Sequence, residues 1–187
     1  MKTNSFFILV FAFFIQCSGQ ERIFKSAVYD DGLVEVLIHG DSISGILSLN
    51  DEIDCRLLFY GKLLDDEITP ITIVNTADLT DNIGSITIRG EDIILKSDNI
   101  IFPCQRVIDL NSGVTFTYTK EAEQTNYQYN VISVEKCLLY STPGKLTTKR
   151  SYLIQGDIVK ILLKKSQWVK INFNSKIYWV DRKDLKF

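Results

Sequence analysis

The residue types that most often perform catalysis are scarce in this chain of 187 residues. His39 is the single histidine, and it precedes Gly40 in what we interpret as an ordinary turn. General acid–base chemistry near neutral pH usually relies on histidine, on a carboxylate with a shifted pKa or on a metal-bound water. The sequence has no Cys and His spacing typical of a metal site and no glycine-rich phosphate loop. We therefore predict a protein that is not an enzyme and that uses no metal and no cofactor.

Carboxylates are the one catalytic residue type that is plentiful. They cluster in Asp51-Glu52-Ile53-Asp54 and in Leu64-Asp65-Asp66-Glu67. Two such groups at a suitable separation form the active site of a glycosidase, and a cluster of them can bind calcium. Both clusters fall between strand-like segments, so we interpret them as solvated loop charge.

The cysteines predict one disulfide and one free thiol. Cys55 and Cys104 each lie in a strand-like context, and a bridge between them would close a loop of about 50 residues. A loop of that length is worth about 4 kcal/mol of stability on the chain-entropy model. Cys137 falls on an apolar alternation, which predicts a buried thiol. A nucleophilic role would need a nearby base, and His39 is far away in sequence.

Residues 1–19 have the features of an export signal. Lys2 gives a positive start, Phe6–Ile15 is an unbroken apolar run of ten residues, and Gly19 offers a small residue at the cleavage position. A membrane-spanning helix needs about 20 apolar residues, so this run is too short to be one. We predict that the signal is removed and that the protein is periplasmic or secreted, where disulfides form.

Cleavage before Cys17 is the alternative, because it would leave a cysteine that carries a lipid anchor. Gln16 counts against this route, since lipid-modified bacterial proteins usually have Gly, Ala or Ser before the cysteine. A released protein is therefore favoured, with a membrane-anchored lipoprotein as the second possibility.

Charge divides the mature chain into two parts. Residues 20–130 contain 8 Lys or Arg against 19 Asp or Glu, and residues 131–187 contain 12 against 4. We predict an acidic domain over 20–130 and a basic domain over 131–187. The two could dock through their opposite charges, or the basic domain could face an anionic partner. Nucleic acid is a poor partner for an exported protein, which leaves anionic cell-wall polymer, lipid headgroups or an acidic protein surface.

Short runs of β-branched and aromatic residues, bounded by Gly, Asn, Asp and Pro, recur along the whole chain. No segment of ten or more residues has a clean helical stripe, so we predict an all-β protein. Alternation of apolar and polar residues in the acidic domain indicates antiparallel hairpins in a disulfide-bonded sandwich or small barrel, and both remain open. The strands predicted there are Leu33–His39, Ser42–Leu49, Cys55–Leu63, Ile71–Asn75, Gly84–Arg89, Asp92–Ser97 and Val114–Thr119.

Five more strands are predicted in the basic domain: Val134–Tyr140, Tyr152–Ile154, Asp157–Lys164, Gln167–Phe173 and Lys176–Val180. A short helical turn follows at 181–185. This segment resembles bacterial SH3 domains in five patches that occur in the same order, namely Leu139–Pro143, Tyr152–Asp157, Trp168–Ile171, Trp179-Val180 and Asp184-Leu185. The resemblance implies a five-stranded SH3-like barrel. It departs from the family at Tyr178, where a glycine is common.

The resemblance also implies binding, since bacterial SH3 domains bind cell-wall peptide or glycan, or other proteins. The residues predicted to bind ligand are the groove aromatics Tyr140, Tyr152, Trp168 and Tyr178, with Lys149 and Arg150 as anion contacts at the edge. The indole rings of Trp168 and Trp179 have a competing role as barrel core, because a domain this small needs its large apolar side chains.

The leading functional hypothesis is an exported binding protein for peptidoglycan or for another exported protein. The alternative is an immunity or inhibitor protein against an exported toxin or cell-wall hydrolase. In that case the acidic domain would cap a basic active site.

Overall fold

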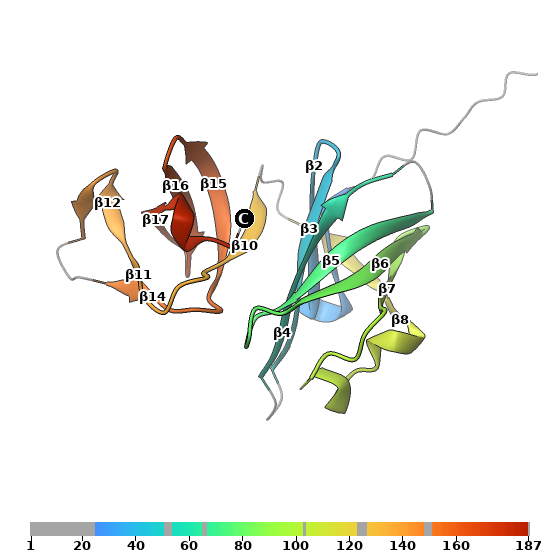
Figure 1. Ribbon diagram of the computed structural model, residues 1–187. Coiled ribbons are helices and arrows are strands. Elements are labelled where there is room, and N and C mark those ends of the chain that lie inside the picture. Colours follow the sequence, from blue (N-terminus) through green and yellow to red (C-terminus); the bar gives the residue numbers. More distant parts are fainter. Residues whose placement is uncertain are drawn as a thin grey trace, which may run out of the picture.

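The computed structural model describes residues 25–50, 54–64, 67–102, 104–122, 127–147 and 151–186. Within these ranges every regular element is a β-strand or a 3₁₀ turn of three residues. The all-β prediction is confirmed. The strands form two units that lie side by side, with β10 between them (Figure 1).

The first unit is a single antiparallel sheet in the order β8-β7-β6-β5-β4-β3-β2-β1-β9. Strands β1 to β8 are neighbours in the sheet as they are in sequence, so short hairpins set the topology. The bounds are β1 (Ala27–Tyr29), β2 (Val34–His39), β3 (Ser42–Asn50), β4 (Asp54–Lys62), β5 (Ile68–Asn75), β6 (Asp81–Arg89), β7 (Asp92–Ser97), β8 (Val114–Phe116) and β9 (Tyr118–Glu121). The seven predicted strands are present, the last of them divided into β8 and β9, whereas β1 was not predicted.

One continuous segment brings the two ends of this sheet together. Strand β8 pairs with β7 and strand β9 pairs with β1, and only Thr117 separates β8 from β9. Asp30 N donates to Thr117 O at 2.9 Å, and Thr117 N donates to Asp30 Oδ1 at 2.9 Å. Tyr118 N donates to Asp92 Oδ1 at 3.0 Å. The backbone N–H groups of Thr117 and Tyr118 therefore have hydrogen-bond partners where the chain passes from one end of the sheet to the other. Of the two predicted alternatives, sandwich or small barrel, the structure shows a nearly closed, barrel-like sheet.

The chain enters and leaves this barrel at the same edge. Lys25 Nζ lies 2.7 Å from Glu121 Oε1, and Ala122 N donates to Ser26 O at 3.0 Å. The backbone bond continues the antiparallel pairing of β1 with β9 beyond the strand ends, and the ion pair lies beside it.

Alternating side chains fill the barrel interior. Gly45 on β3 faces the ring of Phe59 on β4, and a Cβ at this position would collide with that ring. The fully buried members of the core include Val34, Leu47, Leu57, Phe59, Ile73, Ile86, Ile93 and Leu95.

The connection between β7 and β8 folds over the barrel and contributes to its core. Ile101, Cys104 and Leu110 of this connection are buried with the strand residues. Cys104 is bonded to Cys55 at the start of β4, 49 residues earlier, as predicted. Asn75 Nδ2 donates to Phe102 O at 2.9 Å, so the connection is held by a hydrogen bond as well as by the disulfide.

The second unit has its own sheet and its own core. Six strands follow the order β10-β15-β16-β17-β12-β13, and β11 pairs with β14 in a separate ribbon. The bounds are β10 (Gln128–Val131), β11 (Cys137–Leu138), β12 (Tyr140–Thr142), β13 (Lys145–Leu146), β14 (Tyr152–Leu153), β15 (Ile158–Lys165), β16 (Trp168–Phe173) and β17 (Lys176–Asp181). Core members include Ile132, Cys137, Leu139, Leu153, Val159, Val169, Ile171 and Val180. The predicted helical turn is η4 (Arg182–Asp184), in which Asp181 accepts a hydrogen bond from Lys183 N.

The second unit begins earlier than the predicted boundary between residues 130 and 131. Strand β10 starts at Gln128 and pairs with β15, so it belongs to the second sheet. Its four residues, Gln128 to Val131, carry no charge. A boundary drawn from charge alone therefore could not detect this strand.

A third group of buried apolar residues joins the two units. It combines outward-facing residues of β2 to β5 with residues of β10 and of the connecting segment. Its most buried members are Leu37, Leu58, Val74, Ala122, Tyr129 and Val131. Strand β10 lies against β2, β3 and β4 (Figure 1). The hydrophobic contact between the units was not part of the sequence prediction.

Ion pairs border this hydrophobic contact. Lys160 Nζ lies 3.0 Å from Glu35 Oε1, and Lys186 Nζ lies 3.1 Å from Asp81 Oδ1. In each pair the base belongs to the second unit and the acid to the barrel. Docking through opposite charges, one of the two alternatives that the sequence left open, is therefore realised alongside the apolar contact.

The backbones of the two units also approach closely. Tyr129 N donates to Ser44 Oγ at 3.2 Å. Gly156 has φ +89°, and a Cβ on it would lie 2.5 Å from Thr76 O. A residue with a side chain would strain this position and push the units apart.

The first prediction concerns the disulfide. In the double variant Cys55→Ala/Cys104→Ala, the free energy of unfolding measured in urea should fall by about 4 kcal/mol, because the cross-link constrains the unfolded chain over a long loop. Reducing agent should destabilise the parent protein and leave the variant unchanged. A loss below about 1 kcal/mol would show that this bridge contributes little to the barrel.

The second prediction concerns docking. Leu58→Asp places a charge in the fully buried apolar contact, so the two units should separate and thermal unfolding should change from one transition to two. The matched control is Ile83→Asp on the same barrel, at a side chain that is 67% exposed. A single transition in Leu58→Asp, with a midpoint equal to that of the control, would contradict a docked pair.

Candidate ligand-binding face

A row of side chains crosses the outer face of the second sheet. Each member is paired directly with the next across neighbouring strands, and the members are Leu146, Tyr140, Trp179, Lys170 and Leu163. Directly paired residues of antiparallel strands point to the same face. Their sequence neighbours Leu139, Val180 and Val169 lie in the core. The row therefore lies on the side of the sheet opposite to the core and spans β13, β12, β17, β16 and β15.

Trp168 widens this row into a surface. It pairs with Asp181 on one side and with Lys165 on the other, and it lies two residues from Lys170 on the same strand face. The rings of Tyr140 and Trp168 meet edge-to-face, with centroids 4.8 Å apart and planes at 69°. This is a favoured geometry for an aromatic pair. We call the surface formed by Tyr140, Trp168, Trp179, Lys165, Lys170 and their aliphatic neighbours Leu146, Leu163 and Ile177 the aromatic–basic face.

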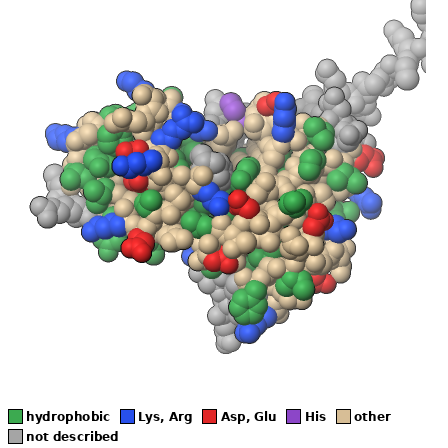
Figure 2. Space-filling model, viewed as in Figure 1, with side chains coloured by type: hydrophobic (Ala, Val, Ile, Leu, Met, Phe, Trp, Pro, Cys, Tyr) green, Lys and Arg blue, Asp and Glu red, His purple; other side chains and the backbone are tan. Residues whose placement is uncertain are grey.

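The apolar side chains of the aromatic–basic face remain in contact with solvent. Leu146 is 45% exposed, Leu163 is 50% exposed and Ile177 is 55% exposed. Tyr140, Trp168 and Trp179 are half-buried. Lys and Arg side chains lie among hydrophobic ones over the second unit (Figure 2). Contiguous exposed apolar surface of this kind is typical of binding sites.

Of the six residues predicted to bind ligand, the structure brings Tyr140 and Trp168 together. Tyr178 is paired with the buried Ile171, so it points to the other side of β17 and packs against the core, as Phe173 does. Tyr152 is 52% exposed on the β11–β14 ribbon, where Lys136 Nζ lies 4.7 Å from the centre of its ring. The predicted anion contacts Lys149 and Arg150 lie outside the described residues.

The sequence prediction missed six members of this surface, namely Trp179, Lys165, Lys170, Leu146, Leu163 and Ile177. The signal was available in the alternation of β16, where Val169 and Ile171 are buried and Trp168 and Lys170 therefore share the opposite face. The pairing of β12 with β17, which places Tyr140 beside Trp179, could not be obtained from alternation within one strand.

The residues with catalytic potential are scattered. His39 is exposed in the hairpin between β2 and β3. Among the described residues, no group of three or more His, Cys, Asp and Glu side chains could hold a metal ion. Residues 51–53 and 65–66 of the two acidic clusters lie outside the described part of the chain. The absence of catalysis stays a prediction.

Cys137 is a free, buried thiol, as predicted. Burial, and next the negative charge of Asp184, raise the pKa of Cys137 to about 12. A thiol that keeps its proton is a poor nucleophile, because the thiolate is the reactive form.

The third prediction follows from this pKa. Native protein produced from Gln20 onward, which lacks Cys17, should react with a thiol reagent such as 5,5′-dithiobis(2-nitrobenzoate) at pH 8 more than about a hundredfold more slowly than the same protein in denaturant. The reason is that almost no Cys137 thiolate exists in the folded state. Cys137→Ala should remove the reaction in denaturant. Equal rates in the native and unfolded states would contradict the burial of this thiol.

The described residues contain no helix with the length and hydropathy of a membrane span. A comparison of the chain with protein-family models, with curated proteins and with solved structures found no significant match. The resemblance to bacterial SH3 domains therefore stays a prediction.

Proposed function

We propose that this chain is an exported, non-catalytic binding protein whose second unit, an SH3-like module, recognises a cell-wall ligand through the aromatic–basic face. Peptidoglycan is the first candidate ligand, and another exported protein is the second. The observation that carries the proposal is the row of aromatic and aliphatic side chains left in solvent across five strands.

Burial patterns support a binding role for this surface. The core of the second unit lies on the other side of its sheet, and Tyr140, Trp168 and Trp179 are not among the residues that form it or pack against it. Aromatic and aliphatic side chains that are exposed next to one another form an apolar patch, and such patches often mark the place where a partner binds. Aromatic residues are also enriched among the residues that dominate binding energy.

The barrel supports the proposal as a scaffold. It holds the β10 end of the second sheet through Tyr129, Val131 and the Lys160–Glu35 ion pair, so the remaining part of the sheet is presented in a fixed orientation. Its disulfide is typical of an oxidising compartment, which supports export to the periplasm or beyond.

The fourth prediction tests the face. Trp168→Ala should reduce the amount of protein that sediments with purified peptidoglycan by about tenfold at limiting ligand, which is the effect of losing one central aromatic contact. The matched control is Phe102→Ala, which removes an aromatic ring that is 61% exposed on the barrel. The control should sediment as the parent protein does.

Circular dichroism and the thermal midpoint establish that both variants are folded. A folded Trp168→Ala protein that sediments with peptidoglycan as well as the parent would rule out recognition through this face.

A further inference from the structure

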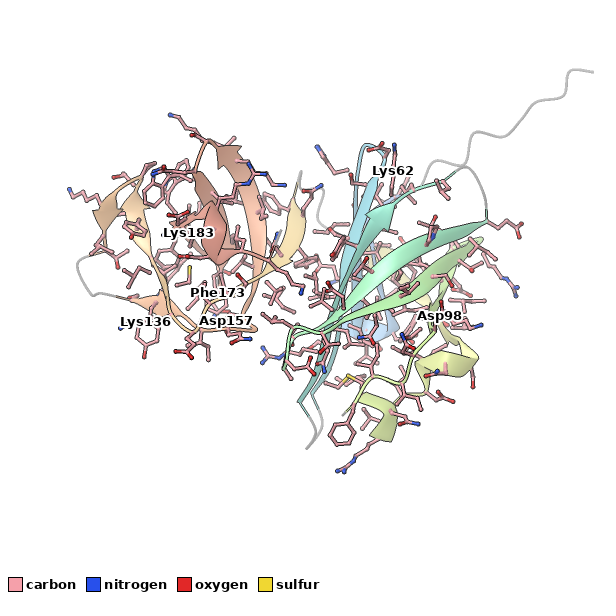
Figure 3. The ribbon with its side chains drawn as sticks, in the orientation of Figure 1. Lys62, Asp98, Lys136, Asp157, Phe173 and Lys183 are labelled. Carbon is pink, nitrogen blue, oxygen red and sulfur yellow. A yellow bond between two sulfur atoms is a disulfide. The ribbon has the colours of Figure 1, made fainter. Side chains whose placement is uncertain are left out.

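Within the described part of the chain, the acidic side chain on the aromatic–basic face has a charged partner in the second unit, whereas the basic side chains do not. Asp181, the acidic residue paired with Trp168, lies 3.5 Å from Lys183 Nζ and accepts a hydrogen bond from Lys183 N. Figure 3 labels Lys183 on the short turn after β17. The negative charge on this face is therefore already balanced from within the second unit.

The lysines of the face have no such partner. Lys165 is paired with Trp168 across the strands and Lys170 with Trp179, and neither takes part in an ion pair among the described residues. Lys160, the next lysine toward the barrel, forms an ion pair with Glu35, with Nζ 3.0 Å from Oε1. The charge left available beside the aromatic rings is consequently positive.

The shape of the face favours an extended ligand. The row from Leu146 to Leu163 crosses five strands, which at the usual spacing between strands is about 19 Å. Its side chains lie along a sheet surface. Lys170 lies two positions from Trp168 on β16, and Lys165 lies directly opposite Trp168 on β15. A small anion would use one lysine and leave most of the row uncovered, whereas a chain with repeated charges covers the row and both lysines.

We propose that the ligand of this face is an anionic polysaccharide of the cell wall, one that carries phosphate or carboxylate groups along its chain. Sugar rings would pack on Trp168, Trp179 and Tyr140, and the anionic groups would pair with Lys165 and Lys170. This inference rests on the proposed function and narrows its ligand from cell-wall material in general to polyanionic chains.

The fifth prediction uses dextran sulfate as a defined polyanion and unmodified dextran of equal length as its neutral counterpart. Lys165→Gln/Lys170→Gln should weaken dextran sulfate binding by about tenfold, since two charge contacts are lost. Lys165→Arg/Lys170→Arg should keep most of the binding. Raising NaCl from 50 to 500 mM should weaken binding by the parent protein, because salt screens exposed charges.

A matched control separates this face from the general positive charge of the second unit. Lys136→Gln/Lys176→Gln makes the same change in net charge, with Lys136 beside Tyr152 and Lys176 paired with the core-facing Phe173. This control should bind dextran sulfate within about twofold of the parent, because Lys136 lies beside the β11–β14 ribbon and Lys176 points to the opposite side of β17 from Ile177. Equal weakening in both double variants would overturn the assignment of the site.

Further outcomes distinguish this inference from the proposed function. If Trp168→Ala loses peptidoglycan binding while dextran sulfate and dextran bind the parent equally, the polyanion inference fails and the proposed function stands. Binding to vesicles of phosphatidylglycerol and phosphatidylcholine without binding to dextran sulfate would overturn the inference in favour of a lipid surface. If Trp168→Ala retains all peptidoglycan binding, the proposed function itself fails.

Discussion

The outer face of the second sheet is buried against the barrel at one end and open to solvent at the other, and this division determines the rest of the arrangement. At the β10 end, Tyr129 and Val131 are buried against the barrel. Toward β12 and β17, Tyr140 and Trp179 stay partly in solvent. One end of the sheet is therefore fixed by an apolar contact, and the other end stays accessible to solvent. A hydrophobic junction with ion pairs at its border gives both strength and a defined orientation.

Local sequence patterns predicted the strands because each strand of the barrel buries one face, which produces alternation and turn residues that can be read directly. The disulfide was predictable because only three cysteines remain after residue 19. Strand β1 was not, since Ala27–Tyr29 is too short to show a period. Closure through Thr117 depends on pairing between strands distant in sequence, and no local pattern records such pairing.

The candidate site was partly predictable for the same reason. Tyr140 and Trp168 were selected as aromatic residues of a binding module, and they do meet. Tyr178 was assigned to the same surface, although it lies two residues before the buried Val180 on one strand and therefore faces the core. The contribution of Trp179 depends on the pairing of β12 with β17. Membership of a surface follows from residue type only when the register between strands is also known.

The neighbouring entry and exit of the chain at β1 and β9 have a consequence for how this architecture could arise. Because Ser26 and Ala122 are joined by a hydrogen bond, the barrel occupies almost no distance along the path of the polypeptide. A unit whose two ends lie this close together can be inserted into another chain without separating the segments on either side of the insertion point. The apolar patch on the outside of the barrel is the feature that holds it against the second unit.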